Sequence, residues 1–297
     1  MAQAQHTRAL GTAAHGGRVD YTLLERGSDG VIQRLAQGLC AGLDGLRTLR
    51  DANGAPLLAA SVVGTGCSSM NPLLAALVPG APALAIDAIE GHLLAPWGAR
   101  AEPVSACVAL VATAKHTLLA RVDAPGRYTP LGQTLDIAAD AVFDGLAQQW
   151  GMDLPGGATL ARMADFGMAE ACELPHPTLD AQSLDFRFAE LRDAALERAR
   201  ALEGSPCEQP RADLAAAVQE AVVHQLSAQA LKALRRTGLT RLSISGGVTR
   251  NDALRAALRP HCELIAPHPQ AATLHSERVA MAALLRHEAS EQAGHRP

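Results

Sequence analysis

Residues 241–266 read RLSISGGVTRNDALRAALRPHCELIA, and their pattern decides the expected fold. An apolar strand over 241–245 runs into the glycine pair 246–247, and a helix is expected from about Asn251. A second strand follows over 262–266. A strand, a glycine turn, a helix and another strand in this order are typical of a mixed α/β domain.

Similar signals occur along the rest of the chain. A long amphipathic helix is expected over 213–236 with Gly238 as its stop, and a final helix is expected after Ser276. Hairpins are expected near residues 10 and 110, each leading into helices and strands. The expected strands are TRALGTAA (7–14), GRVDYTLLERG (17–27), GVIQRLAQ (30–37, leading into a helical stretch), ASVVGTG (60–66), PALAI (82–86), VSACVALVATA (104–114) and HTLLARVD (116–123).

The chain has 297 residues, and single cores stop growing at about 250–300 residues. The two hairpin regions therefore predict two similar lobes around a cleft. We expect an N-terminal lobe over 1–100 and a C-terminal lobe over 101–297, with the last helix free to pack back on the first lobe.

Composition excludes several classes of protein. The net charge of −4 argues against a dedicated nucleic-acid binder, so any bound RNA needs positive charge from a partner or a local patch. No run of about 18 apolar residues and no signal peptide is visible, which predicts a cytoplasmic protein without a membrane span. The six cysteines form no CxxC pair, as expected of reduced thiols.

The segment TLDIAADAVFDGLAQQWGMDLPGG (134–157) places Asp136, Asp140 and Asp144 four residues apart. On a helix these like charges share one face and repel one another. One interpretation makes Asp136 the N-cap of the helix, turns Asp140 to water and puts Asp144 at the rim of the core. The other places one or more of the three beside a ligand cleft closed by the turn at 155–157, where a further helix begins.

Two places in the sequence could carry chemistry. Gly246 and Gly247 end a strand, where backbone N–H groups can approach a phosphate or a ribose. Asn251 then either caps the helix or caps it and also contacts a sugar hydroxyl. His92, in IDAIEGHLLAPW (86–97), and His275 are candidate metal ligands, although the sequence has no HxxxH pair at that point. No Walker motif or G-x-S-x-G elbow is present.

Four longer motifs occur in order: EGHLLAP (90–96), GRYTPLGQTLDIAADAVFDGLAQQWGMDLPGGA (126–158), LDFRFAELR (184–192) and VQEAVVHQLSAQALKALRRTGLTRLSISGGVTRNDALR (218–255). With these motifs the chain resembles the TsaD family, formerly called Gcp, over roughly residues 59–285. The resemblance implies an ASKHA-type α/β fold, in which two lobes enclose a nucleotide cleft. It also implies transfer of a threonylcarbamoyl group from an adenylate donor to the exocyclic amine of a tRNA adenosine beside the anticodon.

The resemblance also implies which residues of this chain contact the adenylate. The adenylate-contacting positions of the family are Asp144, Gly157 and Asn251 here, and the phosphate loop VSGGHT becomes ATAKHT, which contains Thr113, Lys115 and His116. The two glycines of that loop are lost, although Lys115 could pair with a phosphate.

The family also implies one divalent metal, iron or zinc, held by two histidines on one helix face and an aspartate. Here those positions are Ala88, His92 and His275, and Asp87 lies about 100° round the helix from Ala88. Alanine cannot bind a metal, so the implied ligand set is incomplete.

Three hypotheses for the function stay open. The first is a TsaD-like transferase with altered metal and phosphate motifs. The second is a catalytically inactive paralogue that binds a nucleotide or serves as an assembly partner, and the third is a small-molecule carbamoyltransferase, which rests on fold analogy. The resemblance further implies pairing through the N-terminal lobe, with a TsaB-like protein or with a second copy of the chain.

Overall fold

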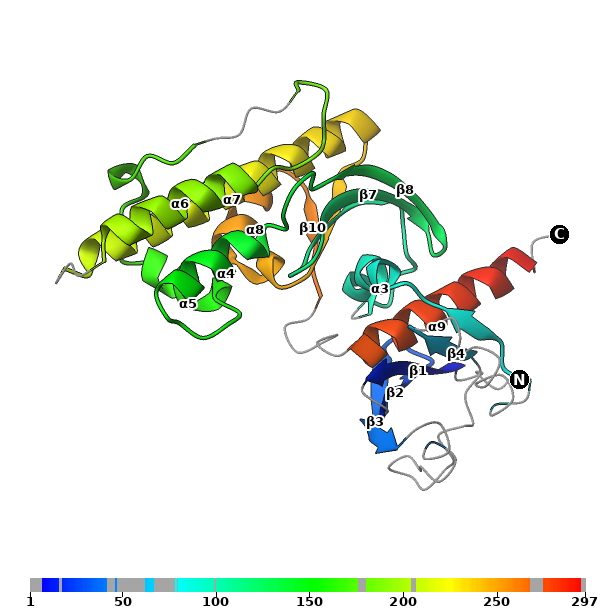
Figure 1. Cartoon of the computed structure of the whole chain (residues 1–297). Helices are drawn as coiled ribbons and strands as arrows, with labels where there is room; N and C mark the ends of the chain where they lie inside the picture. Colours follow the sequence, from blue (N-terminus) through cyan, green and yellow to red (C-terminus); the bar gives the residue numbers. More distant parts are fainter. Residues whose placement is uncertain are drawn as a thin grey trace. The chain divides into compact units, whose positions relative to one another are not determined.

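The computed structural model describes residues 7–15, 18–41, 46, 62–66, 78, 80–98, 100–175, 180–203, 207–267 and 275–294. The chain divides into two compact units, each described by itself below (Figure 1). The first comprises Met1–Ser105, Asp123–Arg127 and Ala266–Pro297, and the second comprises Ala106–Val122 and Tyr128–Ile265. The expected turn at 16–17, and nearly all of the helical stretch expected after GVIQRLAQ, lie outside the described residues.

The first unit contains a five-stranded sheet with the order β3-β2-β1-β4-β5. Strands β1, β2 and β3 are antiparallel neighbours, while β4 and β5 run parallel to β1. All five strands fall where the sequence predicts them, and β3 continues beyond its expected end to Ala41. Their bounds are Thr7–His15 (β1), Arg18–Arg26 (β2), Ile32–Ala41 (β3), Val62–Thr65 (β4) and Ala83–Ala85 (β5).

Helix α9, His275–Gly294, packs directly on this sheet. Two glycines make the close approach feasible. A Cβ on Gly11 of β1 would lie 2.1 Å from the carbonyl oxygen of Ser276, and one on Gly64 of β4 would lie 2.9 Å from that of Val279. The last helix of the chain therefore completes the core of the first unit, together with α3, Ala88–Leu94, and the short helix η2, Ala95–Trp97.

The second unit contains a sheet with the order β10-β9-β6-β7-β8. Strand β6 pairs antiparallel with β7 and parallel with β9, and β9 pairs parallel with β10. The hairpin of β6 and β7 was predicted, whereas the edge strand β8 was not. The strands are Cys107–Ala112 (β6), Thr117–Ala124 (β7), Arg127–Gln133 (β8), Arg241–Ser245 (β9) and Glu263–Ile265 (β10).

Helices accompany this second sheet (Figure 1). Helix α4 packs on α5 and α6, and α7 packs on α5 and α8. The long helix α7 ends at Gly238, which has a φ of 68°, as the sequence predicted. The α/β class is confirmed by both sheets, and no helix in the described ranges has the length and apolarity to cross a membrane. The helices are Asp140–Gln149 (α4), Gly157–Ala164 (α5), Ala169–Ala171 (η3), Ala189–Ala201 (α6), Gln209–Thr237 (α7), Val248–Arg250 (η4) and Asp252–Leu258 (α8).

One face of α7 binds the backbone of residues 182–187. This segment includes most of the LDFRF motif (184–188) and the two residues before it. Four α7 side chains bind backbone groups there, and Phe186 forms a parallel bridge to Thr134 just beyond β8. The segment is thereby fixed between a helix and a sheet edge immediately before α6 begins. The α7 side chains are Gln225, Gln229, Lys232 and Arg236, and they bind the backbone of Arg187, Asp185, Ser183 and Gln182, in that order.

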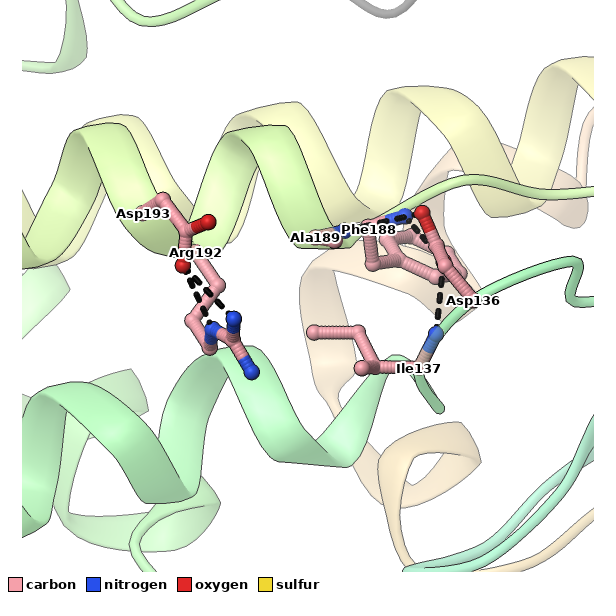
Figure 2. A network of polar contacts seen from close by, with 6 residues as sticks. All are labelled: Asp136, Ile137, Phe188, Ala189, Arg192 and Asp193. Carbon is pink, nitrogen blue, oxygen red and sulfur yellow. Dashed lines mark hydrogen bonds and ion pairs between the residues drawn. The ribbon is translucent and has the colours of Figure 1, made fainter.

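The carboxylate of Asp136 accepts hydrogen bonds from the start of α6 (Figure 2). The donors are the backbone N–H groups of Phe188 at 2.9 Å and Ala189 at 3.1 Å, together with that of Ile137 at 2.6 Å. Helix α4 begins only at Asp140, so the predicted role of Asp136 as its N-cap is wrong. Asp136 instead satisfies N–H groups that the first turn of α6 leaves without helical partners.

We expect Asp136→Ala to lower the free energy of unfolding by about 1–2 kcal/mol, because it removes the acceptor for these N–H groups. Burial raises the pKa of Asp136, but the hydrogen bonds from Phe188, Ile137, Ala189 and Thr134 outweigh it and leave the pKa below its usual value. The contribution is therefore present above the ordinary carboxyl pKa and lost as pH falls below it. Urea unfolding at neutral and acidic pH measures the difference.

The matched control is Asp193→Ala. Asp193 pairs with Arg192 at 2.7 Å, but its side chain is 63% exposed, and exposed pairs contribute about 0–1 kcal/mol. Equal losses from the two substitutions would contradict the capping role of Asp136.

Candidate functional site

The turn between α4 and α5 brings two predicted ligand residues together. Asp144, midway along α4, accepts a hydrogen bond from the backbone N–H of Gly156 at 2.7 Å through Oδ1. Gly157, the next residue, is the first residue of α5. The structure thus places Asp144 beside the N-terminus of a helix whose first N–H groups point toward this turn.

Asp140 joins these two residues, and this was not foreseen. Its exposed fraction is 8%, so the expectation that it faces water is wrong. A Cβ built on Gly157 would lie 3.8 Å from Asp140 Oδ1, which places the carboxylate on the side where Gly157 has no side chain. Burial, with a smaller contribution from the charge of Asp144, raises the pKa of Asp140 to about 6.

The glycine pair after β9 has two different roles. Gly246 has a φ of 107°, and a Cβ there would lie 2.0 Å from the carbonyl oxygen of Ala112 at the end of β6. Thr249 closes the turn by donating to the carbonyl of Gly246 at 2.9 Å. Gly247 has open space where a Cβ would project. Gly246 therefore lets the ends of two parallel strands meet, and Gly247 leaves its surroundings accessible.

Asn251 is the N-cap of α8, as one interpretation of the sequence predicted. Its Oδ1 accepts from the N–H of Leu254 at 3.2 Å, and its Nδ2 donates to Oε1 of Gln219 on α7 at 2.7 Å. Both ends of the amide are thus engaged, and Asn251 holds α8 against α7.

A cavity of about 410 Å³ adjoins Gln219. Met168, which is exposed, is among the lining residues, whereas Asp144, Gly157 and Asn251 are not. Gln219, another lining residue, accepts a hydrogen bond from Asn251. The lining residues are Gly167, Met168, Ala169, Glu170, Ala216, Gln219, Glu220, Val223 and Ala253.

The turn between β6 and β7, at the predicted phosphate-loop position, is closed on itself. The hydroxyl of Thr113 accepts from the N–H groups of Lys115 at 3.3 Å and His116 at 3.0 Å, and donates to the carbonyl of His116 at 3.3 Å. One hydroxyl has one hydrogen to donate and two lone pairs, so this group is fully used. The N–H groups of Lys115 and His116 are therefore engaged within the turn, while both side chains are exposed.

The predicted metal-ligand positions lie on α3 and α9 in the first unit. Ala88, Gly91 and His92 share one face of α3, and a Cβ on Gly91 would lie 3.2 Å from the Cβ of Arg278 on α9. Asp87 caps α3 by accepting from the N–H of Ile89 at 2.7 Å. The face that carries His92 is thus turned toward an arginine.

His275 begins α9 and packs beside Gly66, where an added Cβ would lie 2.6 Å from Nε2 of the imidazole. Burial is the largest effect on its pKa, and together with the positive charge of Arg278 it lowers the pKa of His275 despite the opposing charges of Asp20 and Asp87. Burial and the neighbouring cation therefore favour the neutral form of the His275 imidazole.

A family model described as "TsaD: tRNA N6-adenosine threonylcarbamoyltransferase" matches residues 74–284, well over half of the chain. The chain belongs to the TsaD family. This confirms the resemblance carried by the four motifs.

Named relatives of this TsaD-family chain carry the same description, tRNA N6-adenosine threonylcarbamoyltransferase. One from Bordetella parapertussis is 48% identical over 180 residues, which are 60% of this chain and 52% of that protein. One from Verminephrobacter eiseniae is 38% identical over 303 aligned residues, covering 99% of this chain and 86% of that protein. The chain spans about half the length of the Bordetella relatives that it matches.

Solved structures resemble the TsaD-family chain in fold alone. The Acidaminococcus fermentans (R)-2-hydroxyglutaryl-CoA dehydratase component A has a TM-score of 0.52 at 14% identity, covering 94% of this chain and 98% of that one. HypF from T. kodakarensis has a TM-score of 0.57 at 11% identity, covering 96% and 48%. These likenesses agree with the predicted α/β fold class, which the two sheets confirm.

The metal implied for the TsaD family does not fit the residues present. Ala88 has no donor atom, and the cation Arg278 lies one helical turn from His275. Among the described residues, no group of three or more His, Cys, Asp or Glu side chains is placed to hold a metal ion. No chemical step is therefore derived from a metal at His92 and His275.

We expect the purified protein to contain well below one equivalent of iron or zinc by elemental analysis. Thermal unfolding is expected to be unaffected by either ion, because a stabilising ion must bind the folded state. As the matched comparison, Ala88→His adds the missing imidazole, His275→Asp exchanges an imidazole for the carboxylate of the family pattern, and Arg278→Ala removes the cation. This triple variant is expected to gain affinity for the metal. One equivalent of metal in the unaltered protein would contradict this prediction.

Two residues that lie beside the predicted ligand residues were not singled out from the sequence. Asp140 falls where the family pattern has glycine, and only its helical spacing to Asp144 could have indicated that the two carboxylates lie together. Gln219 gave no signal at all, because its contact with Asn251 joins two helices 32 residues apart.

Proposed function

We propose that this chain is a threonylcarbamoyl transferase that takes its group from an adenylate donor and attaches it to N6 of a tRNA adenosine. The observation that carries the proposal is the α4–α5 turn, where Asp144 and Gly157 lie together at the start of a helix. It is supported by the 38% identity to a relative with that activity in its name over nearly the whole chain.

In this reaction the carbamoyl carbon forms a bond to N6 and its bond to the phosphate oxygen breaks. AMP leaves, and N6 loses one proton. In this proposal Asp144 contacts the ribose, and Gly157 leaves its side of the turn open for the nucleotide. Asn251, Gly246 and Gly247 border the nucleotide. These groups act mainly by holding the donor in a reactive orientation, which can lower a barrier substantially.

Binding of tRNA calls for a partner, because the chain itself carries a net charge of −4. We assign this role to a TsaB-like protein or to a second copy, associating through the first unit. Lys115, an exposed cation at the β6–β7 turn, is the group proposed to meet the phosphate of the donor.

The test is complementation of a strain that lacks the tRNA modification, with the modified nucleoside measured in digested tRNA. The unaltered chain, expressed with its partner protein, is expected to restore it. Asp144→Asn, which retains an acceptor for Gly156, is expected to reduce the yield at least tenfold, whereas the exposed Asp153→Asn is expected to have no effect. If the chain is stable and bound to its partner but the modified nucleoside is not restored, the transferase proposal is wrong.

A second candidate is a nucleotide-binding member without transferase activity. The closed turn at 113–116 favours it, because the N–H groups of Lys115 and His116 are taken up by Thr113. Stabilisation by adenylate, about 2.7 kcal/mol at 100 times its dissociation constant, without any restored modification would identify this candidate. No described contact favours carbamoyl transfer to a small molecule.

A further inference from the structure

The face of α3 that carries a predicted metal ligand packs on an arginine of α9. Ala88, Gly91 and His92 lie on this face, and a Cβ on Gly91 would lie only 3.2 Å from the Cβ of Arg278. The two helices therefore approach one another closely at the point where the family pattern places its two histidines. The side chain of Arg278 begins beside both of those positions.

The third predicted ligand position lies beside the same arginine. His275 comes three residues before Arg278 on α9, so the two side chains lie on one face of that helix. Burial has the largest effect on the pKa of His275, and the charge of Arg278 has the next largest. The carboxylates of Asp20 on β2 and Asp87 at the start of α3 act in the opposite direction but more weakly. All three ligand positions thus border one cation.

Packing alone does not explain why this residue is charged. Burial lowers the pKa of Arg278, and the attraction of Glu277 opposes this effect only in part. Glu277 also pairs with Arg34 at 3.3 Å, so its charge is shared. The folded state therefore disfavours the charged form of Arg278, and an apolar side chain of similar length would avoid that cost.

A fixed cation changes what the three positions can hold. A guanidinium is protonated throughout the physiological pH range. It repels a divalent ion, and the repulsion is stronger where burial lowers the effective dielectric constant. It also needs no set of ligands to hold it in place, because it is covalently attached to α9. This part of the first unit is therefore positively charged without a metal ion.

We propose that Arg278 takes the place of the family's metal ion in this chain, where it supplies a fixed positive charge and excludes divalent ions from the position. The inference concerns the first unit alone and does not depend on the proposed transfer reaction. Any activity of the chain is accordingly expected to be independent of the supply of iron or zinc and to resist chelators.

The test separates the missing ligand from the arginine by calorimetry with zinc on the full chain. Ala88→His with His275→Asp completes the ligand set while Arg278 stays, and this double variant is expected to bind zinc as poorly as the unaltered protein. Adding Arg278→Ala is expected to raise the affinity by on the order of tenfold or more. Adding Arg286→Ala instead removes an arginine of α9 that pairs with Glu90 of α3 at 3.2 Å, and this matched control is expected to leave the affinity unchanged.

Two further exchanges at position 278 distinguish charge from shape. In the double variant, Arg278→Lys is expected to keep zinc out, whereas Arg278→Met is expected to admit it. In the unaltered background, Arg278→Met is expected to leave the melting temperature unchanged or raised, because it removes a partly buried charge. A melting temperature several degrees lower would assign the arginine a structural role and overturn the proposal.

The zinc measurements can contradict the proposal in two ways. Equal zinc affinity with and without Arg278 in the completed ligand set would show that the arginine does not exclude the ion. A folded triple variant that binds no zinc would show that these positions do not form a cation site. The tRNA assay tests the transferase proposal separately, so none of these results bears on it.

Discussion

Gly246→Ala is expected to destabilise the second unit by about 3–5 kcal/mol. The φ of 107° at Gly246 is one that residues with a Cβ rarely adopt, and the new Cβ would lie 2.0 Å from the carbonyl oxygen of Ala112. Because that oxygen belongs to the backbone at the end of β6, relief requires the ends of β6 and β9 to separate. Urea unfolding, followed by circular dichroism, measures the loss.

The neighbouring glycine provides the matched control. Gly247 has a φ of −59°, and nothing lies within 4 Å of the position of its Cβ. Gly247→Ala is therefore expected to change stability by less than about 1 kcal/mol. Similar losses from the two substitutions would show that the crowding against Ala112 is not the cause.

Asp140→Asn is expected to stabilise the protein at neutral pH by about 1–2 kcal/mol, less than the whole pKa shift would give, because solvent screens a partly accessible carboxylate. The pKa of Asp140 is raised from 3.8 to about 6, so the folded state disfavours the ionised form. Stability from a raised carboxyl pKa is fully present below the unfolded value and is lost as pH rises through the folded value. The amide cannot ionise, so the variant avoids this loss.

The advantage of Asp140→Asn should accordingly be small near pH 4 and reach its full size above about pH 7. Thermal unfolding of both proteins across this range measures it. Asp153→Asn, an exposed substitution of the same kind, is expected to show no such trend. A variant that is less stable than the unaltered protein at neutral pH would contradict the raised pKa of Asp140.

Much of the fold was predictable because its signals are local. The pattern of 241–266 predicted β9, the glycine turn, α8 and β10, since each step is set by residues close in sequence. Strand β8 was missed because Pro130 and Gly132 interrupt its pattern. Its place at the edge of the sheet explains why a proline is tolerated there. Helix α6 was missed because charged residues dominate it and only small or sparse apolar residues face the core.

The site was less predictable because it depends on where a helix begins. The spacing of Asp136, Asp140 and Asp144 fixes a shared face only if all three are helical, and α4 starts at Asp140. Asp136 instead accepts a hydrogen bond from Phe188 at the start of α6, 52 residues away. The spacing of the three aspartates cannot indicate a contact at that distance in sequence. Asp144 and Gly157 lie close together because of the turn between them. The family motif implied that proximity, whereas the hydrophobic periodicity did not predict it.

The packing of α9 has a consequence for synthesis. Strands β1, β2 and β4 lie near the beginning of the chain, yet the helix that covers them comes from its last residues. On the ribosome, the early strands emerge long before their cover, while residues 106–265, apart from 123–127, can already complete their own contacts. The strands β1, β2 and β4 therefore keep an apolar face uncovered until residues 275–294 have been synthesised, and a nascent chain stalled before residue 275 would present that face to chaperones.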